Sequence, residues 1–340
     1  MKFLKNNITL ILLSLLCLVL IFISCIVGSG SISVVDSIKA LIYPLIGKDT
    51  EEINEGVKYI IYNIRIPRTL FAALAGAGLS ICGLAFQSIF RNPLSDPYIL
   101  GVSSGASLGA TLAIVLGLEN IIFGISGMSF VFAFLSVIII IKIASYGNRI
   151  HTTTLLLAGI SINFLASAFI SLLMIINQEQ IEKIVFWTMG SLSNINYSSV
   201  IGVSIAVVMG IICITYHARD LNALLIDTQT AKSLGVNVER TKRIILLICT
   251  LMVALIVSES GVIGFIGLVV PHIVRLIIGL DNRRMIPFSI LGGIIFMITS
   301  DVLSRTIMPP SEIPVGSITA LIGSPFFIYL LFNAKKRLKQ

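Results

Sequence analysis

Residues 8–27 read ITLILLSLLCLVLIFISCIV, a stretch of chain without a single charged side chain. A helix rises about 1.5 Å per residue, so a run of this length crosses the ~30 Å hydrocarbon core of a bilayer. Residues 200–216, VIGVSIAVVMGIICITY, have the same character. Backbone groups in lipid must be satisfied internally, and the continuous rather than alternating apolar pattern favours helices over barrel strands.

The composition excludes a water-soluble protein. Hydrophobic residues make up 56% of the 340 residues and charged residues only 12%, against roughly 25% charged in soluble domains. We therefore predict an all-α polytopic membrane protein with a single domain. Its expected transmembrane helices, about ten in number, lie at approximately 8–28, 62–84, 94–116, 121–144, 152–176, 197–216, 242–258, 265–280, 286–306 and 315–333.

The distribution of charge predicts the orientation in the membrane. Lys2 and Lys5 precede the first apolar run as in a secretory signal, but the run exceeds the usual length of about 7 to 15 residues, so an uncleaved first helix is expected. If the N-terminus starts inside, most of the 24 lysine and arginine residues fall on inner loops. The net charge of +8 then reports topology rather than nucleic-acid binding. We predict a multi-pass protein of the cytoplasmic (inner) membrane with both termini cytoplasmic.

No constellation for catalysis or metal binding is evident. The five cysteines lie far apart in apolar segments without metal-ligand spacing, which is typical of small buried side chains. His272 has no second histidine or nucleophile elbow beside it, which disfavours an intramembrane enzyme. We expect no metal and no cofactor bound by this chain.

Small residues at helical spacing indicate close helix packing. Gly101, Gly105 and Gly109 form two GxxxG steps, and such faces pack either within one subunit or across a dimer. Residues 72, 76 and 80 repeat the pattern as Ala, Gly and Ser. The glycines Gly261, Gly264 and Gly267, just before Pro271, predict a broken helix, which membrane proteins tolerate where the backbone is buried or lines a cavity.

Five stretches, in order and spread over about residues 60 to 333, carry a family resemblance. They are RIPRT at 65–69, QSIFRNPLSDPYILGV at 87–102, LLLAG at 155–159, GVIGFIGLVVPH at 261–272 and IPVGSITALIGSPFF at 313–327. Together they resemble the FecCD family, the permeases of binding-protein-dependent importers for ferric siderophores, haem and cobalamin. The resemblance implies the BtuC-like fold of type II importers that are driven by ATP-binding-cassette (ABC) subunits.

The same resemblance implies partners. A second permease subunit, identical or a paralogue, would complete a pore on the dimer axis, with two ATPase subunits beneath and a substrate-binding protein outside. The chain has no GxxxxGK[ST] phosphate loop, so ATP and Mg would be used by the separate ATPase chains.

Three arginines on the predicted outer side run against the general charge bias. Arg65, Arg68 and Arg305 are expected to lie at the outer rim and, by the resemblance, to receive acidic residues of the binding protein. The alternative is snorkelling of these side chains to lipid headgroups.

By the resemblance, residues 217–243 are expected to form a cytoplasmic coupling segment, with a short helix, a glycine turn at Gly235 and a second short helix that fit a groove on the ATPase. The alternative is a solvated linker. The residues assigned to this contact are Leu224, Leu225, Ala231, Leu234, Gly235 and Val236. The resemblance assigns the gate of the translocation path to Asn92, Pro93, Leu94, His151, Thr152 and Thr153, although one of the threonines could instead cap a helix.

The predicted cargo is an iron chelate, either a ferric siderophore or haem, with cobalamin as the alternative within the family. A secondary transporter is the alternative from another class. Such proteins place carboxylates inside the membrane, and Glu259 and Asp301 are the candidates here, although a capping or salt-bridge role fits both better.

Overall fold

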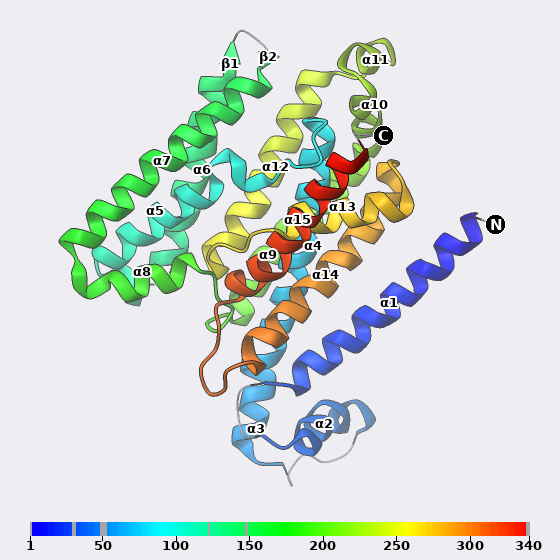
Figure 1. Ribbon diagram of the computed structural model, residues 1–340. Helices are drawn as coiled ribbons and strands as arrows, with labels where there is room; N and C mark the ends of the chain where they lie inside the picture. The colour runs from blue at the N-terminus through cyan, green and yellow to red at the C-terminus, as the bar shows by residue number, and fades with distance from the viewer. Residues whose placement is uncertain (1, 29–31, 48–52, 122, 147–148, 338–340) are drawn as a thin grey trace.

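The protein is described by a computed structural model that covers residues 2–28, 32–47, 53–121, 123–146 and 149–337 (Figure 1). Helices dominate this part of the chain, and a hairpin of two-residue strands, β1 (Ser145–Tyr146) and β2 (Arg149–Ile150), joins two of them. The long helices are α1 (Lys2–Ile26), α4 (Ile66–Ile89), α6 (Gly124–Ala144), α7 (Thr152–Ile176), α9 (Tyr197–Tyr216), α12 (Val238–Ser260), α14 (Asn282–Thr306) and α15 (Val315–Arg337).

The shorter helices connect or flank the long ones. They are α2 (Val34–Ile42), α3 (Glu55–Tyr59), α5 (Val102–Val115), α8 (Ile181–Thr188), α10 (Ala218–Ile226), α11 (Thr228–Ser233) and α13 (Ile266–Ile278), with single turns η1 (Tyr43–Ile46), η2 (Ile60–Arg65), η3 (Pro97–Leu100), η4 (Leu118–Asn120) and η5 (Gln178–Gln180).

The all-α membrane fold is confirmed. Among the described residues, 7 helices are long and apolar enough to cross a membrane, and three shorter apolar helices begin at Val102, Ile266 and Val315. Together these occupy the ten predicted positions. The observed ends agree with the predicted 152–176 and 197–216. The largest difference is at 62–84, where α3, η2 and α4 form one continuous helical run, Glu55–Ile89.

The first part of that run belongs to a small core of its own. η2 is a π-helical turn, and Ile61 within it packs with Ala40 and Ile53, all of them buried. The hydroxyl of Tyr62 donates to the carbonyl oxygen of Ala40. This α2–α3 unit projects from one end of the bundle (Figure 1).

α4 is the central helix of the bundle and packs against α14, α9, α13 and α12. Glycines allow these close approaches, as predicted for packing within one subunit. A Cβ at Gly76 would lie 2.2 Å from the carbonyl oxygen of Gly293 on α14. In the same way, Gly105 and Gly109 of α5 face α6, where a Cβ at Gly109 would lie 2.4 Å from the carbonyl oxygen of Met128. Both small-residue faces therefore contact helices of the same chain.

Candidate functional site

The predicted break in a helix is present between α12 and α13. Residues 261–265 are not helical, and Gly261 has a φ of +67°. A Cβ at Gly261 would lie 2.2 Å from the carbonyl oxygen of Trp187, so both the backbone conformation and the space require glycine. A Cβ at Gly267 would lie 2.9 Å from the carbonyl oxygen of Leu79, whereas nothing lies within 4 Å at Gly264. The break thus depends on Gly261, whereas Gly267 lies inside α13 and allows its close contact with α4.

A buried side chain satisfies the backbone beside this break. Pro271 lies inside α13 and has no N–H to donate to the carbonyl oxygen of Gly267. The amide nitrogen of Gln87 from α4 lies 3.3 Å from that oxygen and 3.3 Å from the carbonyl oxygen of Leu268, and Gln87 is completely buried. Gln87 therefore supplies the donor that proline removes, which is the way broken helices persist at membrane depth. Sequence reasoning missed this role, although a glutamine in an apolar helix was its signal.

Two of the three arginines that were predicted for the outer side, Arg68 and Arg305, form a buried cluster with two acids. Arg68 Nε lies 2.8 Å from Asp301 Oδ1, and Arg68 Nη1 lies 2.8 Å from Glu312 Oε2. Arg305 Nη2 lies 2.9 Å from the other oxygen of Asp301 without the alignment of a hydrogen bond. Asp301 thus bridges two guanidinium groups. The predicted salt-bridge role of Asp301 is confirmed, because its carboxylate is fully buried and paired on both sides.

Arg65 belongs to the same end of the molecule. Its Nη1 donates to the carbonyl oxygen of Ile26 at the end of α1, and Arg305 Nη1 donates to that of Val27 at 2.9 Å. Arg65 and Arg68 are each 4% exposed and Arg305 is 2% exposed. All three side chains are therefore buried at this end of the molecule, so the snorkelling alternative is wrong. Acids and carbonyl groups remote in sequence draw the guanidinium groups inward.

The coupling segment consists of two short helices, α10 and α11, followed by a turn at Gly235. Asp227 starts α11 as its N-cap and accepts from the backbone N–H of Gln229 at 2.9 Å. This hydrogen bond is the largest cause that lowers the pKa of Asp227 below its ordinary value. Gly235 has a φ of +82°, as predicted, but it follows both short helices. The predicted order, with the glycine turn between the helices, is wrong because an aspartate cap makes that connection.

Burial divides the residues that were assigned to the ATPase contact. Leu224 is 2% exposed and Ala231 is fully buried, so both pack into the chain's own core and their assignment to a partner surface is wrong. Leu234 is 67% exposed. Ile226, which was not among the predicted residues, is 70% exposed. Leu225 and Val236 are partly buried and Gly235 is exposed. An apolar surface therefore remains on this segment, centred on Ile226 and Leu234.

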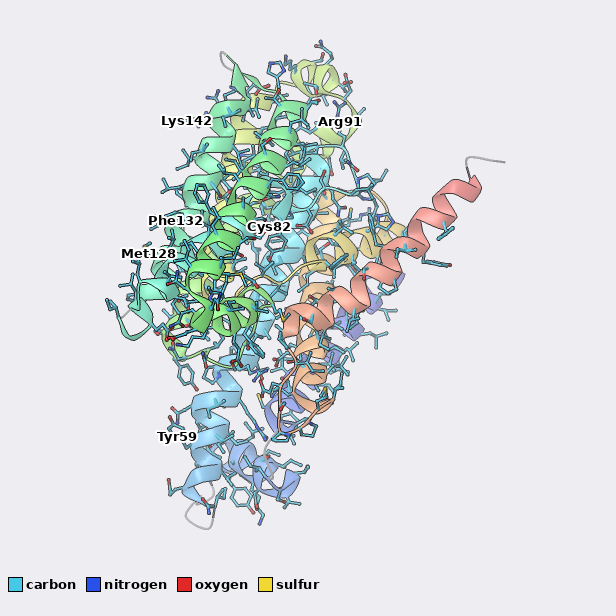
Figure 2. The ribbon with its side chains drawn as sticks, turned by 60° about the vertical axis from the view of Figure 1, so that its left-hand side comes forward. Tyr59, Cys82, Arg91, Met128, Phe132 and Lys142 are labelled. Atoms are coloured by element: carbon cyan, nitrogen blue, oxygen red, sulfur yellow. The ribbon has the colours of Figure 1, made fainter. Side chains whose placement is uncertain are left out.

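The predicted gate segments lie at the same end of the molecule as the coupling segment. Figure 2 places Arg91 and Lys142 together at one end of the molecule and Tyr59 at the other. Arg91 Nη1 lies 3.3 Å from Asp227 Oδ1, which links the turn after α4 to α11. On the other side, Glu239 in the first turn of α12 accepts from the backbone N–H of Ile150 at 3.0 Å, which links the hairpin before α7 to the coupling segment.

Most of the predicted gate residues are exposed. Asn92, Pro93 and Leu94 are exposed in a turn, and Asn92 Oδ1 accepts from the backbone N–H of Leu94 at 2.9 Å. His151 is exposed and occupies the N-cap position of α7 without a side-chain capping bond. Thr152 and Thr153 follow within the helix and are partly buried and exposed, respectively. The capping alternative for a threonine is therefore not realised.

A polar hollow between α5 and α7 was not predicted. It has a volume of about 340 Å³, and Ser104 Oγ lies 2.5 Å from Asn163 Oδ1 on its wall. Hydroxyl groups at three positions of α5 and an amide on α7 are costly in lipid unless they face protein or a water-filled cavity. The residues that line it are Ser103, Ser104, Ser107, Asn163, Ser167, Ile170, Thr188 and Val262. Serines spaced three and four apart in an apolar helix were the available signal.

Asp96 lies in the turn before η3, outside the helices that cross the membrane, and its Oδ1 accepts from the backbone N–H of Tyr98 at 2.8 Å. Burial raises the pKa of its carboxyl from 3.8 to about 6. The folded state therefore binds more protons than the unfolded state between these two values, and stability falls as pH rises through that window.

We expect Asp96→Asn to match the parent in stability near pH 4 and to exceed it by up to about 3 kcal/mol at pH 7. Asparagine keeps the acceptor for the Tyr98 N–H and does not titrate. Thermal unfolding of both proteins at the two pH values measures the difference. A difference that is independent of pH would contradict the raised pKa.

The fold and these features define a class, a multi-pass helical membrane permease. The chain belongs to the FecCD transport family, whose profile matches residues 16–333.

Two relatives show how close the similarity is. The chain is 40% identical over 283 residues, which cover 83% of it and 76% of the relative, to the cobalamin import system permease protein BtuC of Halobacterium salinarum. It is 38% identical over 289 residues, 84% of this chain and 86% of the other, to the hemin transport system permease protein HmuU of Yersinia pestis. A solved structure of a metal-chelate type ABC transporter in an inward-facing conformation matches 96% of this chain and 99% of its own, with a TM-score of 0.82 and 31% identity.

Proposed function

We propose that this chain is the membrane subunit of an ABC importer that moves an iron chelate, a ferric siderophore or haem, into the cell. Membership of the FecCD transport family is the observation that carries the proposal. Cobalamin is the second candidate cargo, because the relative that is 40% identical is named as a cobalamin permease. A second permease subunit, two ATPase subunits that use ATP and Mg, and an extracytoplasmic binding protein complete the proposed complex.

In the proposed orientation both termini and the coupling segment face the cytoplasm, and the α2–α3 unit faces outward. The end of the chain in α15 and the start of α1 both lie toward the half of the molecule that carries α10 and α11 (Figure 1). The buried cluster around Asp301 lies near the α2–α3 unit. Docking of the binding protein on Arg68 and Arg305 then requires these side chains to exchange their internal acids for external ones. Docking on Arg65 requires it to leave the carbonyl oxygen of Ile26.

Uptake of labelled ferric siderophores, haem and cobalamin, by parent and gene-deleted cells with the proton gradient collapsed and ATP maintained, tests the function. Loss of one cargo on deletion, with uptake by the parent surviving the collapse, would establish both ATP-driven import and its cargo. Uptake that disappears with the gradient would instead favour a secondary transporter.

Exposed apolar residues on the coupling segment support the proposed contact with an ATPase chain. Ile226→Glu and Leu234→Glu are each expected to weaken copurification of the ATPase chain by about tenfold or more, because charges replace apolar contacts at the centre of an interface. Leu116→Glu, at an equally exposed position (64%) outside this segment, serves as the matched control. Copurification of all three variants at the parental level would contradict the contact.

A further inference from the structure

An apolar cleft of about 330 Å³ lies between α1, α13 and α14, apart from the features described above. Among the described residues that line it, Thr9 alone has a polar side chain. The other walls are aliphatic and aromatic, and they include Leu13 of α1, Val270 and Ile277 of α13, and Phe288 and Ile295 of α14. A cavity with so few polar partners does not hold ordered water, so its occupant is expected to be apolar.

The floor of the cleft is closed and one side is open. A Cβ at Gly292 would lie 2.9 Å from Val270 Cγ1, which shows that α13 and α14 are in close contact there. α1 packs against α14 and α4, and its N-terminal part runs away from the bundle (Figure 1). The gap between α1 and α13 therefore opens where α1 diverges.

The cleft has about the depth of one bilayer leaflet. Its lining residues run from Ile278, the last residue of α13, to Phe296 of α14. On α14 they run from Phe288 to Phe296, eight residues further along, which corresponds to about 12 Å along a helix. Half of the hydrocarbon core is about 15 Å thick, so an acyl chain that enters beside the α13–α14 turn can extend along the whole cleft.

The α13–α14 turn at the mouth of the cleft is basic. Arg284 precedes Phe288 by four residues and so lies on the same face of α14. Its side chain is 54% exposed, and its Nε is 3.8 Å from Asp281 Oδ2, too far for a hydrogen bond. Arg283 is also exposed, so two arginines outweigh one aspartate, and the positive N-terminus of α14 adds to them. The carboxylate of Asp281 also accepts a hydrogen bond from the side-chain amide of Asn222 at 2.7 Å.

We propose that this cleft binds one phospholipid with an anionic headgroup, its acyl chain between α1, α13 and α14 and its phosphate on Arg284 and Arg283. Basic sites between transmembrane helices on the cytoplasmic side are suited to such headgroups. The bound chain fills the space between α1 and the bundle. The choice of leaflet rests on the orientation given under the proposed function, whereas binding itself is independent of the transported cargo.

The test uses the full chain in nanodiscs of equimolar phosphatidylglycerol and phosphatidylcholine, with retained lipids counted by native mass spectrometry after release. The parent is expected to retain one more molecule of phosphatidylglycerol than of phosphatidylcholine. Arg283→Gln with Arg284→Gln is expected to reduce this preference at least about fivefold. Ile273→Phe, which fills the cleft, is expected to lose the retained lipid, while Ile143→Phe on an exposed face of α6 behaves as the parent.

Equal retention of the two lipids by the parent would overturn the proposal, and so would undiminished retention by Ile273→Phe. Because the assay involves no transport, a failure of the proposed cargo leaves its result unchanged. If another helix closes the cleft, the parent will retain no lipid, and that result would also overturn the proposal.

Discussion

Asp301→Ala is expected to lower the free energy of unfolding by about 3–5 kcal/mol, because it removes the acid that pairs with buried Arg305 and one of the two acids that pair with buried Arg68. The carboxylate of Asp301 is fully buried and lies within 3 Å of the guanidinium groups of Arg68 and Arg305. Without it, Glu312 still pairs with Arg68, whose Nη1 lies 2.8 Å from Glu312 Oε2. Two guanidinium groups cannot leave the protein for water at this depth without disrupting the ends of α1 and α14.

Denaturant unfolding of the purified protein in mild detergent measures this effect. Glu55→Ala is the matched control, because it removes an acid whose side chain is 86% exposed and which pairs with Lys58 at 2.7 Å. Exposed pairs contribute roughly 0–1 kcal/mol. Asp301→Leu combined with Arg305→Leu should be less destabilised than Asp301→Leu alone, since the unpaired charge is then also removed. Similar unfolding of Asp301→Ala and Glu55→Ala would refute the buried bridge.

Gly83→Ala is expected to cost about 3 kcal/mol or more, at the upper end of the range for overpacked cores. A Cβ at Gly83 would lie 1.8 Å from the carbonyl oxygen of Gly267. The obstacle is backbone, which cannot rotate away as a side chain can. The helices α4 and α13 would have to separate, and Gln87 would lose its hydrogen bonds to the carbonyl groups beside Pro271.

Gly202→Ala on α9 is the matched control, because a Cβ there has no atom within 4 Å. Alanine at an open helical position is expected to be neutral or slightly stabilising. The same detergent unfolding assay compares the two variants. Equal midpoints for Gly83→Ala and Gly202→Ala would show that α4 and α13 do not pack as closely as described.

Much of the fold could be predicted because a bilayer imposes a length and a polarity on every segment that crosses it. The apolar runs 152–176 and 197–216 became the helices α7 and α9 with the predicted ends. The glycines before Pro271 marked a break because proline removes a donor and Gly261 takes a positive φ. Each of these signals is local, so the sequence alone was sufficient.

The environment of individual side chains depended on contacts between distant segments. Arg68 binds Asp301 and Glu312, which follow it by 233 and 244 residues, and no local pattern links them. In the coupling segment, Leu224 is buried while Ile226, two residues later, is exposed, because packing selects one face of a short helix.

The sequence by itself therefore determined the membrane class, the helical segments and the family, since these follow from hydrophobic length and from motifs in order along the chain. The tertiary structure alone decided that Arg65, Arg68 and Arg305 are buried, that Gln87 completes the broken helix, and that Ile226 and Leu234 are exposed. The physical reason is that the burial of a side chain and its hydrogen-bond partners depend on which elements meet in space.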